Sequence, residues 1–293
     1  MFDIQTLPHL IRQDIEHGEN HFPIVQDDVP PVVAADPGWT RQWRKAKAQL
    51  QHPERLSMDS WSAKRKARLG EFLAMVGFFE LELIVHGCTH AATHYEMPAV
   101  WRTCLIKQGY QDMEHAASYL TRGSRMNNQD YWQSLGGSVY RQGIESLYPL
   151  LERDLGGFFA LIGLHTEAYP AETNILDAFM FDPVIAHWLP HEIEEEAGHL
   201  SFLYPAMRTF LHSGTPEEQA RKKQQLVADD QMLQEVFVQN MFKKMAVEWM
   251  VGDLGVDAAE LAVYERIPER THYIYRTIGI EEEYWPAHLK QGL

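Results

Sequence analysis

Hydrophobic residues recur with the period of an α-helix over most of the chain after residue 60. Several of the helices that this pattern predicts have clear N-terminal signals. Pro98 suits a first helical position, Asp182 caps a helix that opens with Pro183, and Thr215 forms a capping box with Glu218. The predicted helices cover residues 61–95, 99–120, 147–169, 182–210, 216–250 and 256–277. Since no alternating strand pattern of useful length appears, the sequence predicts an all-α protein.

Glycine and proline residues set the expected ends and breaks of these helices. Gly123 is the expected end of the second helix, and a short helix is expected around Tyr131. Pro170 must kink or end the third helix, and Pro190 predicts an irregularity in the fourth. The third and fourth helices are therefore expected to be less straight than the first two.

The first 58 residues differ from the rest of the chain because they are rich in proline, aspartate and histidine and show no sustained period. We expect residues 1–58 to form an extension wrapped on the body, and residues 59–293 to form a single helical domain. A chain of 293 residues, 45% of them hydrophobic, is long enough to bury a core without disulfide bonds. Its two cysteines form no disulfide framework or cysteine-based metal motif.

Charge and local composition argue against several classes of function. The net charge of −15 would repel a nucleic acid backbone, so no nucleic acid partner is expected. The longest apolar stretch, residues 72–85, is interrupted by Glu80 and Glu82, which argues against a membrane-spanning helix. The first residues lack the basic and apolar regions of a signal peptide, and a reducing, cytoplasmic location is expected.

Two acid-x-x-His pairs lie inside predicted helices, Asp112 with His115 and Glu196 with His199. Residues three apart share one face of a helix, so each pair can offer a carboxylate and an imidazole to the same metal ion. Each pair also has an acid on the preceding helix. Glu82 lies 30 residues before Asp112, and the midpoint coincides with the break at Pro98. Residues equidistant from a hairpin bend face each other in an antiparallel pair.

The third and fourth helices repeat this arrangement, with Glu167 lying 29 residues before Glu196. The combined pattern resembles the ferritin-like di-iron carboxylate superfamily, whose bundle core takes one acid from each of two helices and an acid-x-x-His pair from each of the other two. The resemblance implies a four-helix bundle core at residues 60–212 holding two Fe ions, or Mn. The implied metal ligands are Glu82, Asp112, His115, Glu167, Glu196 and His199.

The resemblance also implies supporting residues around the metals. Gln111 and Glu195 each precede the acid of a pair, where they would hydrogen-bond the histidine of the opposite pair and orient it. Asp112 stands where the pattern usually has glutamate, and its shorter side chain puts full metal occupancy in question. Glu82 is preferred over Glu80 because it shares a face with Phe78, Phe79, Val85 and His86.

A stripe of histidines follows Glu82 on the first helix, because His86, His90 and His94 recur every four residues. One hypothesis makes His86 an extra metal ligand or a proton relay to the metal centre. The alternative is that these are interior or interface histidines whose ring nitrogens are satisfied by neighbouring polar groups.

The expected function is that of a di-iron oxygenase or oxidase, which activates dioxygen to oxidise a small hydrophobic or aromatic substrate. The sequence carries no flavin, nicotinamide or iron–sulfur motif, so an external reductase or ferredoxin is expected as a partner. A homodimer is compatible with this prediction. Two alternatives stay open: a haem-oxygenase-like di-iron oxidase, and a metal-free helical scaffold subunit related to such enzymes.

Overall fold

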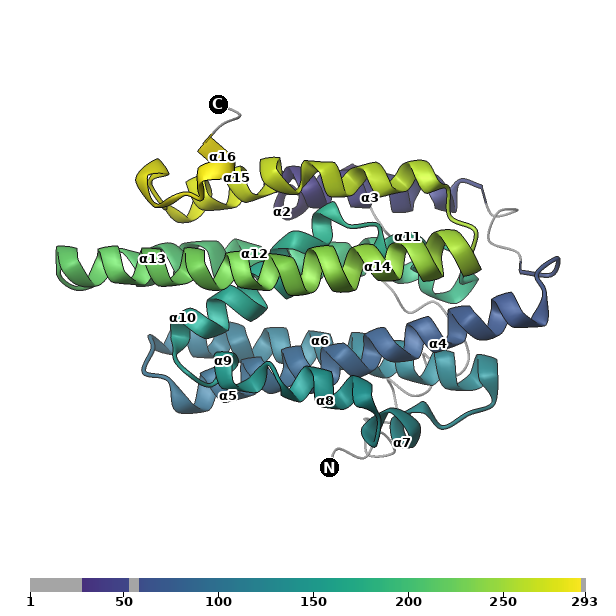
Figure 1. Cartoon of the computed structure of the whole chain (residues 1–293). Coiled ribbons are helices and arrows are strands. Elements are labelled where there is room, and N and C mark those ends of the chain that lie inside the picture. The colour runs from purple at the N-terminus through teal and green to yellow at the C-terminus, as the bar shows by residue number, and fades with distance from the viewer. Residues whose placement is uncertain (1–27, 53–57, 291–293) are drawn as a thin grey trace.

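The computed structural model describes residues 28–52 and 58–290 (Figure 1). Every regular element within these ranges is helical, which confirms the all-α prediction. The expected N-terminal extension falls partly outside the described residues. Its described part forms α2 (Pro31–Ala34) and α3 (Pro37–Leu50), and both helices pack against α12 (Pro183–Leu211).

The first long arm is one continuous run of helical backbone with a change of winding in its middle. It comprises α4 (Ala63–Phe79), the π-helical η3 (Glu80–Val85) and α5 (His86–His94). The Ser62 side chain caps its start by accepting a hydrogen bond from the Arg65 backbone N–H. In η3 the backbone winds more widely than in an α-helix, so side chains after residue 79 are rotated from the positions that a uniform 3.6-residue period predicts.

The second arm, α6 (Ala99–Asn127), returns along the first, and Figure 1 shows α4 and α6 side by side. It begins directly after Pro98 and ends at Asn128, whose left-handed φ of 49° closes the last turn. The prediction that Gly123 ends this helix was therefore wrong. A Cβ at Gly123 would collide with the Gly70 carbonyl oxygen, so this glycine lets two helices approach closely.

We expect Gly123→Ala to destabilise the fold by about 2 kcal/mol, because the added methyl group must push α4 and α6 apart. Gly143→Ala is the matched control, since Gly143 lies in α8 (Val139–Glu145) and a Cβ there meets nothing within 4 Å. That control should gain about 0.5–1 kcal/mol from its higher helix propensity. Urea unfolding measures both, and equal effects of the two substitutions would contradict this account of Gly123.

The third predicted helix, residues 147–169, is interrupted. It divides into α9 (Tyr148–Leu151), α10 (Leu155–Phe158) and the π-helical η4 (Phe159–Ala168), and Pro170 ends it in the short η5 (Tyr169–Glu172). The break follows from Asp154, whose side chain accepts a hydrogen bond from Gly157 N at 2.8 Å and so starts a new helix. The predicted short helix at Tyr131 is confirmed as α7 (Tyr131–Gly136), and α11 (Ile175–Phe179) precedes the fourth arm.

The fourth arm is α12, which begins as predicted because the Asp182 side chain accepts hydrogen bonds from Val184 N and Ile185 N. Pro190 lies inside α12 without ending it. The capping box of Thr215 and Glu218 is also confirmed, and it starts α13 (Pro216–Leu233). The chain then continues through η6 (Gln234–Phe242), α14 (Lys243–Met245), η7 (Ala246–Asp253), η8 (Ala258–Arg266), α15 (Ile267–Ile278), η9 (Glu282–Tyr284) and α16 (Ala287–Lys290).

The helices lie in layers, with α12 in the middle (Figure 1). It packs against α6 and η4 on one side and against α3 and α15 on the other. Within the outer layer a buried ion pair joins α15 to the start of α3, since Arg270 Nη1 lies 2.7 Å from Asp36 Oδ1. Arg270 also donates to the Ala168 carbonyl oxygen at the end of η4, which ties the outer layer to the inner one. The outer helices therefore shield α12 and η4 from water on that side.

Among the described residues, one helical run, 63–94, is long and apolar enough to cross a membrane. Half of its apolar window is buried against other helices. This burial is consistent with the core helix of a soluble protein.

Candidate metal centre

Buried carboxylates and imidazoles from several helical segments converge at the centre of the molecule. Asp112 and His115 come from α6, Glu167 comes from η4, and Glu196 and His199 come from α12. One ligand atom from each of Asp112, Glu167, Glu196 and His199 lies within 4.8 Å of the others. His115, Glu192 and Glu196 form a second group by the same measure. Glu196 belongs to both groups and lies where a carboxylate would bridge two ions.

Both histidines direct their Nδ1 atoms at Glu196. His115 Nδ1 lies 3.4 Å from Glu196 Oε1, and His199 Nδ1 lies 3.5 Å from Glu196 Oε2. His199 Nδ1 is also 3.1 Å from Glu167 Oε2 and 3.8 Å from Asp112 Oδ1. His115 Nδ1 also lies 3.9 Å from Asp112 Oδ1. Each imidazole therefore directs its Nδ1 atom at a group of carboxylate oxygens, and each approaches a different oxygen of Glu196.

The other ring nitrogen of each histidine is held from outside the cluster. His115 Nε2 donates to Glu195 Oε2 at 2.9 Å, and His199 Nε2 lies 3.2 Å from Gln111 Oε1. Gln111 Nε2 in turn donates to Glu195, so its amide oxygen must be the atom that accepts from His199. This is the crossed pairing expected from the sequence. Because both Nε2 atoms carry the proton in the neutral rings, both Nδ1 atoms are free to bind a cation.

We expect Gln111→Ala and Glu195→Ala each to weaken metal binding by about 10–100-fold, because the opposite imidazole loses the partner that fixes its orientation and tautomer. Equilibrium titration with Fe(II) under anaerobic conditions measures the effect. Unchanged affinity in both alanine variants would remove these residues from the metal centre.

The structure does not bring Glu82 to this cluster, which corrects the choice made from the sequence. Its Oε2 atom lies 3.4 Å from the Tyr148 hydroxyl group and 3.5 Å from Arg141 Nη2. Glu80 is the acid that faces inward. It is buried, and its Oε2 atom has no hydrogen-bond partner. The reason is the π-helical turn of η3, which rotates this part of the arm relative to a uniform α-helix.

Glu192 and Gln108 also lie at the site, although neither is part of the acid-x-x-His pattern or of the acids expected on the preceding helices. Glu192 is buried and accepts a hydrogen bond from the Tyr119 hydroxyl group. Gln108 Nε2 donates to Glu167 Oε1 at 2.8 Å. Both could have been found from spacing, because Glu192 lies four residues before Glu196 and Gln108 lies four before Asp112, on the same helix faces.

His86 is the other residue that the structure places elsewhere. Its Nε2 atom lies 3.4 Å from Glu152 Oε1 on the surface of the molecule. The side chain is 38% exposed, whereas the two cluster histidines are each 4% exposed. His86 is therefore neither an extra ligand nor a proton relay within the buried group.

Electrostatics show how strongly the cluster attracts positive charge. Burial raises the pKa of Asp112 to about 7 and that of Glu192 to about 8, and it raises the pKa of Glu167 well above its usual range. Burial alone would lower the pKa of His115 and His199, but the surrounding carboxylates outweigh it and raise both well above the usual value. In a chain without metal, protons on these groups must supply the charge that compensates the carboxylates.

The residues present fit a pair of metal ions. Five acids lie together in the core. Four of them are buried, namely Glu80, Asp112, Glu167 and Glu192, and the side chain of Glu196 is 14% exposed. Asp112 Oδ2, Glu80 Oε2 and His115 Nδ1 have no hydrogen-bond partner, although each is an atom that can bind a metal. A set of carboxylate oxygens and imidazole nitrogens without thiolate suits Fe or Mn. Cations at this position would satisfy the orphaned atoms and neutralise the buried acids.

Substitution of each acid tests directly whether Glu80 or Glu82 is a metal ligand. We expect Glu80→Gln to reduce the metal content of the purified chain, because a buried charged ligand is lost, while Glu82→Gln leaves the metal content unchanged. Elemental analysis after Fe(II) loading and desalting measures both variants. The two acids are two residues apart on the same arm, so each serves as the control for the other. The opposite result would restore the choice of Glu82.

An apolar cavity of about 80 Å³ opens beside the cluster. Three cluster acids, Glu80, Glu192 and Glu196, reach its wall. The rest of the lining is almost entirely hydrophobic, and it includes Val76, Phe79, Ile84, Tyr140, Ile175, Leu176, Phe179, Met241, Phe242 and Met245. The cavity gives a small apolar molecule access to the carboxylates.

Comparisons of this chain with protein-family models, with curated proteins and with solved structures each found no match.

Proposed function

We propose that the chain is a non-haem di-iron oxidoreductase that activates dioxygen to oxidise a small apolar substrate. The observation that supports this most strongly is the paired arrangement of His115 and His199. Both have Nε2 held by an outer partner and Nδ1 directed at opposite oxygens of Glu196. A metal-free scaffold has no need for two imidazoles preset in this way inside a group of buried acids.

The residues divide into two ligand sets that share Glu196. Asp112, Glu167 and His199 would hold one ion, and His115, Glu192 and the nearby Glu80 would hold the other. When bound, two Fe(II) ions supply the electrons that reduce dioxygen. This donor set comes from α6, η4, α12 and η3, which is the four-segment pattern of the ferritin-like bundle that the sequence resembles.

The chain's own side chains provide a proton and a dry binding space. The Tyr119 hydroxyl group donates to Glu192, so it holds a proton at the edge of the cluster. The ring of Tyr119 stacks between Trp188 and Phe179, with centroids 5.4 and 4.5 Å away, which keeps the hydroxyl group in place. The apolar walls of the cavity exclude water from the side where Glu80, Glu192 and Glu196 face it.

The size of the cavity bears on the substrate. Its volume of about 80 Å³ is below the roughly 150 Å³ of an apolar cavity that holds benzene. A small molecule or the end of a slender alkyl chain fits it, while a larger aromatic ring requires the flexible side chains of Met241 and Met245 to move. An external reductase or ferredoxin would supply electrons.

Dioxygen consumption tests the proposal. The anaerobically loaded chain, given a chemical reductant, should consume dioxygen much faster than its His199→Ala variant. His187→Ala is the matched control, because His187 lies exposed on the same helix and its Nδ1 atom contacts only the Pro183 carbonyl oxygen among the interactions described. Equal rates in wild type and His199→Ala would overturn the proposal. A wild-type chain that holds no metal would favour the scaffold alternative instead.

A further inference from the structure

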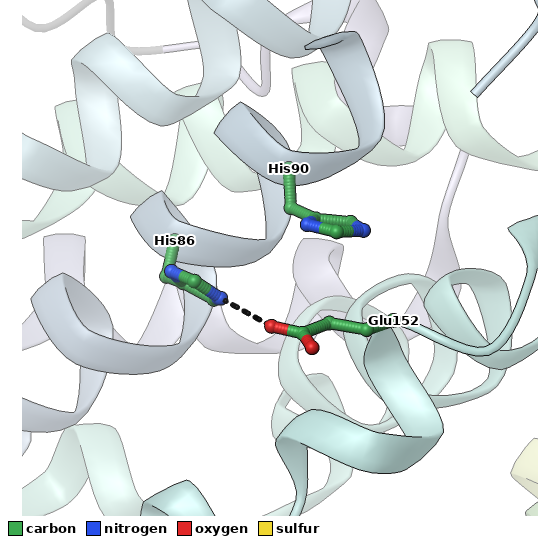
Figure 2. A group of neighbouring side chains, drawn as sticks. All are labelled: His86, His90 and Glu152. Carbon is green, nitrogen blue, oxygen red and sulfur yellow. Dashed lines mark hydrogen bonds and ion pairs between the residues drawn. The ribbon is translucent and has the colours of Figure 1, made fainter. Parts of the chain in front are cut away.

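A second group of metal-binding side chains lies on the surface, on the histidine stripe of α5. His86, His90 and Glu152 each offer one ligand atom, and these atoms lie within 4.8 Å of one another. Figure 2 shows the two imidazoles on successive turns of α5, with the carboxylate of Glu152 facing them from a separate segment. Glu152 directly follows α9, so the group joins two parts of the chain that are far apart in sequence.

The spacing of the two histidines suits a metal ion. Residues four apart lie one above the other on a helix, and histidine pairs at this spacing bind Zn²⁺ from one helix face. The distance from His86 Nε2 to Glu152 Oε1 is 3.4 Å. Two ligands of a tetrahedral Zn²⁺ ion, each about 2.0–2.1 Å from it, are about 3.4 Å apart. These two atoms therefore already have the separation that coordination requires.

Neighbouring rings hold the histidines in place. The His86 ring stacks on Tyr148 with centroids 4.4 Å apart and an angle of 21° between the planes. The His90 ring lies between those of His86 and His94, with centroid distances of 6.2 and 4.3 Å. Side chains that are already ordered lose less entropy when they bind an ion.

We propose that His86, His90 and Glu152 bind a divalent first-row transition metal ion, with Zn²⁺ the ion that the donor set suits best. Three protein ligands leave one coordination position to water or to an added ligand. The site shares no residue with the buried cluster and does not depend on the function proposed for it. Occupancy would tie α5 to the segment between α9 and α10, which leads into η4.

Calorimetric titration of the full chain with Zn²⁺ alone tests the proposal. His86→Ala and His90→Ala should each abolish the binding of one Zn²⁺ per chain or weaken it by more than about 100-fold. Loss of a residue that only hydrogen-bonds a metal ligand weakens binding by about 10–100-fold, so loss of a ligand should cost more. Glu152→Gln should weaken the same binding event. The buried cluster is unchanged in all three variants, so any Zn²⁺ bound there stays as an internal reference.

The matched control is His94→Ala, which changes the next histidine of the same stripe. His94 is outside the group, and its Nδ1 atom already contacts the Thr93 hydroxyl group at 2.8 Å. Retained binding in His94→Ala, together with a Zn²⁺-dependent rise in Tm that His90→Ala abolishes, supports the site. Equal binding in wild type and His90→Ala overturns it. A loss of Zn²⁺ binding in His94→Ala, together with unchanged binding in Glu152→Gln, also overturns the proposal. The ion would then be bound by His90 and His94.

Discussion

Replacing Glu196 with alanine should remove metal from both positions of the buried cluster. Glu196 is the one residue common to the two ligand groups, and each of its oxygens faces the Nδ1 atom of a different histidine. Its loss removes a ligand from both ions and leaves His115 and His199 without the carboxylate between them. We expect about two irons per wild-type chain after anaerobic Fe(II) loading and close to none in Glu196→Ala, measured by elemental analysis.

Glu194→Ala is the matched control for this substitution. Glu194 lies two residues away on α12 but is exposed, and it belongs to neither ligand group. Its metal content should equal that of the wild type. Retention of both irons in Glu196→Ala would contradict the assigned centre.

Without metal, the folded chain should lose stability as the pH rises from about 5 to 8. In the folded state burial raises the pKa of Asp112 to about 7 and that of Glu192 to about 8, well above their unfolded values. Between the unfolded and folded pKa values the native state binds more protons, so the free energy of unfolding falls with rising pH. Each group contributes about 1.4 kcal/mol per pH unit, and the total loss is several kcal/mol.

The other titrating groups of the cluster do not reverse this trend. The pKa of His115 and His199 is raised, so their stabilising contribution is present at low pH and is lost as the pH rises through the folded values. Burial would raise the pKa of Glu196, but the two imidazoles outweigh it and lower that pKa. Its contribution is therefore lost only as the pH falls below its usual range, outside the window considered.

Urea unfolding at pH 5 and pH 8, after treatment with a chelator, measures this dependence. Adding Mn(II) should flatten the slope, because the ions take the place of the protons, and metal binding at pH 7 should release protons into solution. The metal-loaded chain is the control, because acids outside the cluster contribute to the pH dependence of unfolding both with and without metal. The same pH slope with and without metal would contradict the assignment of the cluster as a metal centre.

The sequence was enough to predict most of the helices and much of the cluster. Local signals were strong where a side chain caps the backbone, as at Asp182 and Thr215, because such hydrogen bonds depend only on neighbouring residues. The acid-x-x-His pairs were found because a fixed spacing of three places both side chains on one face. Asp112, His115, Glu196 and His199 all meet in the structure as a result.

The errors arose where tertiary packing overrides the regular period. A π-helical turn cannot be recognised from hydrophobic spacing. Because of this turn, Glu80 and not Glu82 faces the cluster. Glu192 was hidden within an acidic run that is typical of a solvent-exposed face, and only the three-dimensional contacts show it to be buried. Glycine is typical of a helix end, but Gly123 lies inside α6, where it allows the close approach of Gly70 on α4.

Anomalous diffraction from a crystal of the chain grown with Mn(II) tests the central claim most directly. We expect two anomalous peaks about 3.5–4 Å apart, one on each side of the Glu196 carboxylate. One peak should lie near His115 and the other near His199. A map with no peak at this cluster, or with peaks only at the surface group of His86 and His90, would contradict the account.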